Sequence, residues 1–117
     1  MIDRMDRLAD LLCHELAEIL QHGLKDPRVR LATVAGVTVS RDLAHAKVRV
    51  SVLGSDDERR RCVAALVHAR GFVRSLLARR VRLRTVPELR FELDRGAEHS
   101  QRISEILESL DADAESP

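Results

Sequence analysis

Aromatic residues are almost absent from this sequence. Its 117 residues include two phenylalanines, Phe72 and Phe91, and no tyrosine or tryptophan. Single-stranded RNA is often held by bases stacked on several exposed aromatic rings. The composition excludes such a platform, so any RNA binding must rest mainly on other contacts. The core must be aliphatic, which suits a chain that is 44% hydrophobic.

Cysteines and long apolar runs are also scarce. Cys13 and Cys62 stand far apart, each among apolar neighbours in a helical pattern, which favours two buried free thiols over a disulfide. No apolar run approaches the roughly 18 residues of a membrane span. The N-terminus has no apolar stretch of the kind found in signal peptides. We therefore expect a cytoplasmic protein with no membrane partner.

Signatures of catalysis and metal binding are missing as well. The sequence has no glycine-rich phosphate loop and no serine in a nucleophile elbow. Its histidines never combine with one another or with cysteine at the spacings of metal sites; they are His14, His22, His45, His68 and His99. We therefore expect no enzymatic activity, no catalytic residues, no cofactor and no metal.

What the sequence does have is arginine, concentrated in one stretch. The formal net charge is only +1, and all but two of the twenty basic residues are arginine. Residues 55–87 carry nine basic and three acidic residues, whereas residues 88–117 carry three basic and nine acidic ones. A GC-rich genome explains arginine over lysine but not this clustering. Such a separation can build a positive surface on a nearly neutral protein.

The hydrophobic pattern predicts one α+β domain over residues 1–110, followed by an acidic flexible tail over 111–117. Helical spacing predicts a first helix from about Met5 to Leu20, capped by Asp3 and ended by Gly23. Alternating residues predict strands over 31–40 and 46–52, joined as an antiparallel hairpin, and a third strand over 89–93. A last helix is expected to carry apolar residues between Ile103 and Leu110.

Two details of this pattern are specific. In the first strand Ala35, Val37 and Val39 are expected to share one face, and Gly36 to mark a bulge or a close backbone approach. Two helical pieces are expected to meet at a kink at Ala69-Arg70-Gly71. The inner faces of these pieces are predicted to carry Val63, Leu66 and Val67, then Phe72, Val73, Leu76, Leu77 and Val81. The third strand can return parallel to one of the first two, over helices that cover one face of a three-stranded sheet.

Arginines around the predicted kink are the main candidates for RNA contact, because each guanidinium can contact a phosphate in bidentate fashion. They are Arg70, Arg74, Arg79, Arg80, Arg82 and Arg84, with Lys25, Arg28, Lys47 and Arg49 as weaker candidates. An alternative is that about a third of these arginines form ion pairs with the acids of residues 88–117. Arg90, which lies between Glu88 and Glu92 on one strand face, is expected to be paired in this way. Arg59 to Arg61 fit RNA contact and plain solubility equally well.

The predicted order of elements is that of a type II KH domain, in which a Gly-x-x-Gly loop clamps the backbone of single-stranded RNA. This chain has Ala69-Arg70-Gly71 at that place. Together with the following motifs, this kink resembles the ribosome-binding factor A family. The motifs are Lys25-Asp26-Pro27-Arg28, the hairpin from Val39 to Val48, Ala69 to Leu77, Arg82-Leu83-Arg84, Val86-Pro87-Glu88-Leu89, and Phe91 with Asp94.

The resemblance implies a KH-like fold and a monomeric, non-catalytic factor that binds free 30S ribosomal subunits and 16S rRNA. It implies help in late 30S maturation and in 16S rRNA processing, release by a ribosome-dependent GTPase, and a role that matters most in the cold. Ala69 and Gly71 would set the kink. One departure is Arg49, at a position that is usually aromatic in the family, which would replace a stacking contact by a charge contact.

A rival interpretation is a protein–protein adaptor. Its basis is the acidic final helix, from Glu98 to Leu110, which could bind a basic ribosomal partner. Salt separates the two hypotheses, because contacts with phosphates weaken steeply as salt rises.

Overall fold

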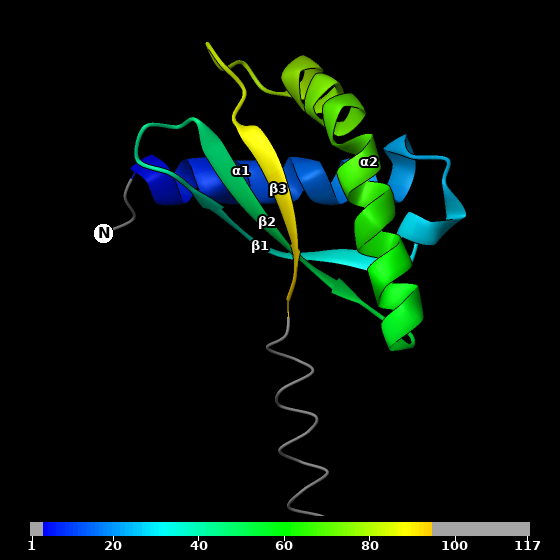
Figure 1. Cartoon of the computed structure of the whole chain (residues 1–117). Helices are drawn as coiled ribbons and strands as arrows, with labels where there is room; N and C mark the ends of the chain where they lie inside the picture. Colours follow the sequence, from blue (N-terminus) through cyan, green and yellow to red (C-terminus); the bar gives the residue numbers. More distant parts are fainter. Residues whose placement is uncertain (1–3, 95–117) are drawn as a thin grey trace, which may run out of the picture.

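The computed structural model describes residues 4–94 (Figure 1). The predicted cap Asp3, the final helix, the acidic tail and the domain end at residue 110 lie outside the described residues. The described elements are α1 (Arg4–Glu18), a π-helical turn (Ile19–Gly23), a 3-10 turn (Pro27–Val29), β1 (Ala32–Val39), β2 (His45–Val52), α2 (Asp56–Arg80) and β3 (Glu88–Leu93).

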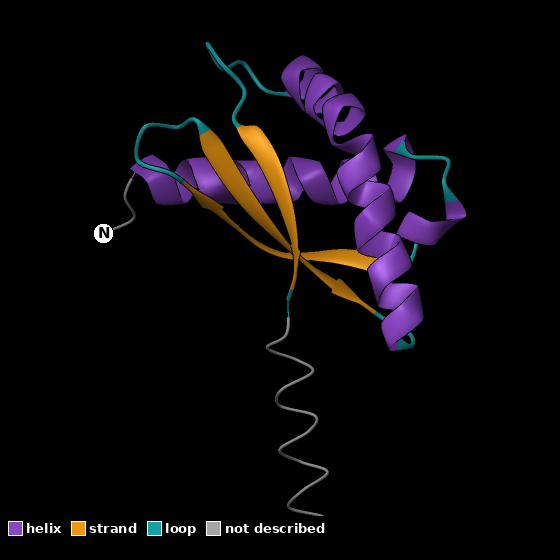
Figure 2. Ribbon diagram, in the orientation of Figure 1, coloured by secondary structure: helices purple, strands orange, loops and turns teal. Residues whose placement is uncertain are grey.

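The three strands form one mixed sheet in the order β1-β2-β3 (Figure 2). The hairpin strands β1 and β2 are antiparallel, while β3 returns parallel to β2 with Val48 opposite Phe91. The parallel return requires a long crossover, and α2 supplies it. The α+β class and the three-stranded sheet predicted from the sequence are therefore confirmed.

Strand β1 contains the bulge that Gly36 was expected to mark. Its register with β2 shifts between Val34 and Gly36. The extra residue shifts the alternation of the strand by one, so that the residues facing the helices are even-numbered before the bulge and odd-numbered after it. Ala32 is therefore buried before the shift and Val39 after it, while Ala35 is exposed. The prediction that Ala35 shares the inner face with Val37 and Val39 is wrong for this reason.

Both helices cover the same face of the sheet, and the core lies between. In Figure 1, α1 crosses behind the strands and α2 runs beside β3. The inner face of β2 is fully buried at Ala46, Val48 and Val50. Larger aliphatic side chains enclose it, as expected for a chain nearly free of aromatics; those with almost no exposed surface are Leu12, Leu16, Ile19, Leu20, Leu66, Leu77 and Leu89.

Helix α2 begins at a capping box, in which Ser55 and Glu58 satisfy each other's backbone N–H groups. It then runs unbroken for 25 residues to Arg80. Helix α2 is therefore not divided into two helices, but Figure 1 shows its axis changing direction, in agreement with the prediction of a kink in place of a straight rod. A glycine inside a helix costs only about 1 kcal/mol, and the buried stripe continues past Gly71 to Val73 and Leu77. Ser75 Oγ donates to the Gly71 carbonyl at 3.0 Å, a contact that bends helices without ending them.

The unbroken stripe also changes which apolar residues are buried. Cys62, Leu66, Val73 and Leu77 lie on the inner face. Val67 and Phe72 fall outside it and remain 43% and 56% exposed. Both had been predicted to face inward. Cys13 is half-buried and Cys62 buried, and both are free thiols. Burial raises the pKa of the Cys62 thiol.

Candidate nucleic-acid interface

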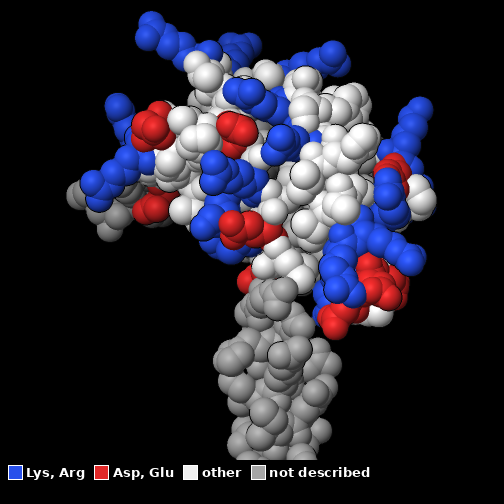
Figure 3. Space-filling view, in the orientation of Figure 1, with Lys and Arg blue, Asp and Glu red and all other residues white. Residues whose placement is uncertain are grey.

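A basic surface lies where α2 ends and the chain turns toward β3. We call Arg79, Arg82 and Arg84 the arginine corner. All three side chains are exposed. None forms an ion pair with another residue in the range 4–94. Figure 3 shows basic side chains along the upper edge of the molecule, where α2 and the connector meet in Figure 1. These guanidinium groups are free to bind an external anion.

Arg74 and Arg80 lie beside the arginine corner but have partners within the protein. Arg74 donates from Nε and Nη2 to the Val86 carbonyl, at 3.1 and 2.6 Å. Arg80 Nη1 lies 3.1 Å from Glu15 Oε2 on α1. The first contact ties the connector to α2, and the second ties α2 to α1. Both residues therefore position the corner, and each guanidinium already has one partner within the protein.

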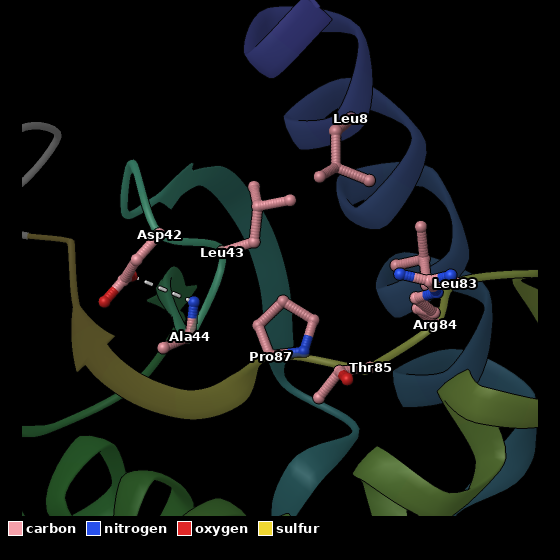
Figure 4. Close-up of a pocket in the computed structure, with 8 residues that line it drawn as sticks. All are labelled: Leu8, Asp42, Leu43, Ala44, Leu83, Arg84, Thr85 and Pro87. Carbon is pink, nitrogen blue, oxygen red and sulfur yellow. Dashed lines mark hydrogen bonds between the residues drawn. The ribbon is translucent and has the colours of Figure 1, made fainter.

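A hollow of about 330 Å³ separates the connector from the hairpin turn. Figure 4 shows Leu8 of α1, Leu43 of the turn and Pro87 of the connector between two sides of the hollow. Asp42 and Ala44 lie on one side, and Arg84 lies on the other. The walls are mostly apolar and Arg84 contributes a charge at the rim. The hollow extends the surface beside the arginine corner.

The turn between β1 and β2 is built around Asp42. Its Oδ1 accepts from Ser40 Oγ at 2.6 Å and from the Ala44 N–H at 3.0 Å. The Ser40 hydrogen bond, followed by that from Ala44, lowers the pKa of the Asp42 carboxyl. Leu43 is held with φ of 61°, a conformation that costs a branched residue energy. The network fixes Leu43 in place with its side chain 42% exposed.

The open face of the sheet carries the weaker candidates Lys47 and Arg49, and both have partners on the sheet. Lys47 Nζ lies 3.9 Å from Glu92 Oε2. Arg49 Nη1 donates to Thr38 Oγ1 at 2.9 Å, and its guanidinium lies over Gly36, where a Cβ would collide with it. Gly36 thus marks both a bulge and a close approach. Arg90 forms no ion pair within residues 4–94, so the expectation that it pairs with Glu88 or Glu92 is wrong; Lys47 takes Glu92 instead.

The loop after the π-helical turn holds Lys25 and Arg28. Arg28 makes a bidentate contact with Asp26, with Nη2 at 2.6 Å from Oδ2 and Nε at 3.0 Å from Oδ1. This contact lowers the pKa of the Asp26 carboxyl to about 2 and raises that of the Arg28 guanidinium. Lys25 is exposed and forms no ion pair in the described part of the chain. Of the two, Lys25 is the available cation.

The arginine-rich stretch forms ion pairs within the described residues with Asp56, Asp57 and Glu15, and none with Glu88 or Glu92. Most of the acids of residues 88–117, the predicted partners, lie outside the described residues. Arg59 and Arg60 pair with the acids one turn earlier, which favours the solubility interpretation for these two. Arg70 is exposed and forms no ion pair with another described residue, whereas Ala69 is half-buried. Glu15 and the Val86 carbonyl were missed because contacts across the fold leave no local signal.

Residues 4–94 contain no cluster of three or more histidine, cysteine or acidic side chains that could hold a metal ion. No helix among them is long and apolar enough to cross a membrane.

Comparison with known proteins gives one consistent family. The family model described as "Ribosome-binding factor A" matches residues 4–107. A ribosome-binding factor A from Desulforamulus reducens is 39% identical over 117 residues, covering 100% of this chain and 98% of the relative. Another, from Thioalkalivibrio sulfidiphilus, is 47% identical over 110 residues, covering 94% of this chain and 85% of the relative.

Solved structures give the same result. The crystal structure of ribosome-binding factor A from Thermus thermophilus matches with a TM-score of 0.71 and 35% identity, covering 79% of this chain and 97% of that one. A homology model of the Thermus thermophilus factor, fitted into a cryo-EM map of a 30S complex, matches with a TM-score of 0.62 and 36% identity, covering 74% of this chain and 90% of that one. The fold is therefore KH-like.

Proposed function

This chain belongs to the ribosome-binding factor A family, and we propose that it binds the free 30S ribosomal subunit through 16S rRNA. The bound chain assists late maturation of the subunit and efficient processing of the 16S rRNA ends, and it cuts no RNA itself. It acts as a cytoplasmic monomer and leaves with the help of a ribosome-dependent GTPase. The homology model of the Thermus thermophilus factor, fitted into a map of a 30S complex, supports a ribosomal partner.

The observation that carries the proposal is the arginine corner. Arg79, Arg82 and Arg84 are exposed and lack an acidic partner among the described residues. Unpaired guanidinium groups bind phosphates without first breaking an internal ion pair. Arg74 and Arg80 hold the connector and α1 in place around them, so the corner is fixed before RNA arrives. Less ordering on binding means less entropy lost.

The mechanism is a shift of population among rRNA conformations. A protein that binds one conformation more tightly than another raises the fraction of the first, and no covalent step is needed. In this proposal the corner binds phosphates that come together only in the maturing conformation. Accumulation of that conformation would let the processing enzymes reach the rRNA ends. A requirement that grows in the cold follows, because misfolded RNA escapes more slowly at low temperature.

Sedimentation of the purified chain with free small subunits over a range of salt tests the proposal. Five neutralised phosphates should give a slope of about −4 for log affinity against log salt. The chain should bind free subunits, and incubation with precursor rRNA should leave that RNA uncut. A shallow slope would instead favour the adaptor hypothesis, and absence of binding would refute the proposed function.

A further inference from the structure

A second hollow, of about 400 Å³, lies between α2 and the loop that follows the π-helical turn. Ala65, Ala69 and Val29 form its lining near the core, and Lys25 and Phe72 lie at its edge. It is separate from the hollow beside the hairpin turn, since the two share no lining residue. No residue of the arginine corner lines it.

Small side chains make the space. Gly23 approaches α2 so closely that a Cβ there would lie 3.1 Å from Leu76 Cδ1. Next to that approach, α2 presents the short side chains of Ala65 and Ala69. A Cβ on Gly71, in contrast, would meet nothing within 4 Å. The two ends of the Ala-x-Gly motif thus have different surroundings, and Ala69 is the one that keeps a cavity open.

Phe72 supplies a flat apolar face at this cavity. It is 56% exposed, whereas the other phenylalanine, Phe91, is 7% exposed in the core. A single exposed apolar side chain is common and by itself means little. An exposed ring that borders a cavity beside an available cation is the arrangement used to stack an unpaired base whose phosphate is neutralised nearby.

The charges around Phe72 match a phosphate chain. Lys25 borders the same cavity and is unpaired within residues 4–94. Asp26 also borders it, but its carboxylate is already held by Arg28. Arg79 lies seven residues beyond Phe72 on the same helix, which is two turns and about 10 Å along one face. Available cations on two sides of the ring favour an RNA strand over an apolar protein side chain.

We propose that this cavity takes one unpaired nucleobase of single-stranded RNA, stacked on Phe72, with its flanking phosphates on Lys25 and Arg79. The inference rests on the proposed function for the nature of the ligand and deepens it, because it adds a contact to a base. The arginine corner would hold the strand by charge, and the cavity would require the strand to have one base free of pairing.

Paired RNA probes test this. One probe is a fluorescent 12-nucleotide single-stranded RNA; the other is an abasic oligomer with the same number of phosphates. One stacked base should make the native chain bind the first probe about tenfold more tightly than the second. Ala69→Leu fills the cavity and Phe72→Leu removes the ring while keeping an apolar side chain. Both variants should lose the preference and keep the affinity for the abasic oligomer.

Ala64→Leu is the matched control, since Ala64 is exposed on the same helix and does not line the cavity. It should keep the tenfold preference. Equal binding of the two probes by the native chain, or an unchanged preference in Phe72→Leu, would overturn the inference. Phe72→Leu decides the matter even if Ala69→Leu fails to fold, because Phe72 is exposed. Binding of the native chain to small subunits, measured beside these, shows whether the proposed function itself stands.

Discussion

The arginine corner and the open face of the sheet carry comparable numbers of basic side chains but differ in how those side chains are engaged. At the corner, Arg79, Arg82 and Arg84 have no ion-pair partner among residues 4–94. On the sheet, Lys47 pairs with Glu92 and Arg49 donates to Thr38, whereas Arg90 forms no ion pair among these residues. Figure 3 shows the consequence, with acidic and basic side chains mixed in the centre and basic ones along the upper edge.

The difference arises from the secondary structure. Parallel pairing places Glu92 opposite Arg49 and diagonal to Lys47, which forms the ion pair with it. The same pairing places His45 opposite Glu88, with His45 Nδ1 3.7 Å from Glu88 Oε2, so a neighbouring strand brings acids to the side chains of β2. A helix end followed by a connector has no neighbouring strand to supply acids. Arginines placed there stay available. Availability of charge, and not its count along the sequence, is therefore the basis on which we propose the arginine corner as the RNA-binding surface.

Reversing the corner should have the largest effect. Arg79→Glu, Arg82→Glu and Arg84→Glu combined should weaken binding to small subunits by about 100-fold or more, since charge-assisted hydrogen bonds contribute about 1.5–3 kcal/mol each. The matched variant carries Lys47→Glu, Arg49→Glu and Arg90→Glu on the sheet and should lose far less. Sedimentation measures both. Equal losses would show that pairing does not distinguish the two surfaces.

Releasing the connector should have a smaller effect. Arg74→Met keeps the length of the side chain but cannot donate to the Val86 carbonyl. Backbone hydrogen exchange over residues 82–87 should speed up, and subunit binding should fall by about fivefold, because the corner must then be ordered on binding. Arg70→Met, exposed and unpaired, is the control and should leave exchange unchanged. An unchanged rate of hydrogen exchange in Arg74→Met would contradict the proposal that Arg74 positions the connector.

Removing the acidic partner of Lys47 on the sheet should slightly raise the affinity for RNA. Glu92→Gln removes the partner of Lys47, and exposed ion pairs are worth about 0–1 kcal/mol. Affinity for single-stranded RNA should rise by about twofold. Glu88→Gln, whose partner is His45, is the control and should change less. Anisotropy titrations at fixed salt measure the two, and a fall in affinity on Glu92→Gln would contradict the matched-charge account.

The Asp26–Arg28 pair should produce the smallest effect, one visible mainly in a titration. The pKa of Asp26 is lowered from 3.8 to about 2 by its hydrogen bonds from Arg28. Because the native pKa is depressed, the stability that this pair contributes is complete above pH 3.8 and is lost as the pH falls through about 2. Carboxyl NMR shifts should give a midpoint near 2, and Arg28→Met should return it toward 3.8. A midpoint near 3.8 for Asp26 in the native chain would mean that Arg28 is not held by Asp26 and is as available for binding an anion as Lys25.

Local patterns in the sequence carried most of the fold. The alternation from Ala46 to Val52 has its cause within a few residues, and the strand that it predicted is confirmed. Gly71 led to the wrong prediction of a break between two helices. The free-energy cost of a glycine in a helix is local, whereas the buried stripe that outweighs it runs along the whole helix. The face of Ala35 was predicted wrongly because the bulge between Val34 and Gly36 changes which face of the sheet the preceding residues of the strand lie on.

The site was less predictable, because availability depends on tertiary contacts. Arg79 and Arg80 are indistinguishable as neighbours in sequence, yet Arg80 meets Glu15 from a helix 65 residues away and Arg79 does not. Arg74 resembles Arg70 until the connector folds back and presents the Val86 carbonyl. Phe72 could have been placed at the surface from the sequence, since the stripe through Leu66, Val73 and Leu77 leaves it to one side.

Density for this chain on a free small ribosomal subunit is the most direct test of the central claim. The guanidinium groups of Arg79, Arg82 and Arg84 should lie within hydrogen-bonding distance of rRNA phosphates, at about 2.7–2.9 Å. Lys47 should still be paired with Glu92. Density that places the open sheet face on the rRNA, with the arginine corner turned to solvent, would contradict the account.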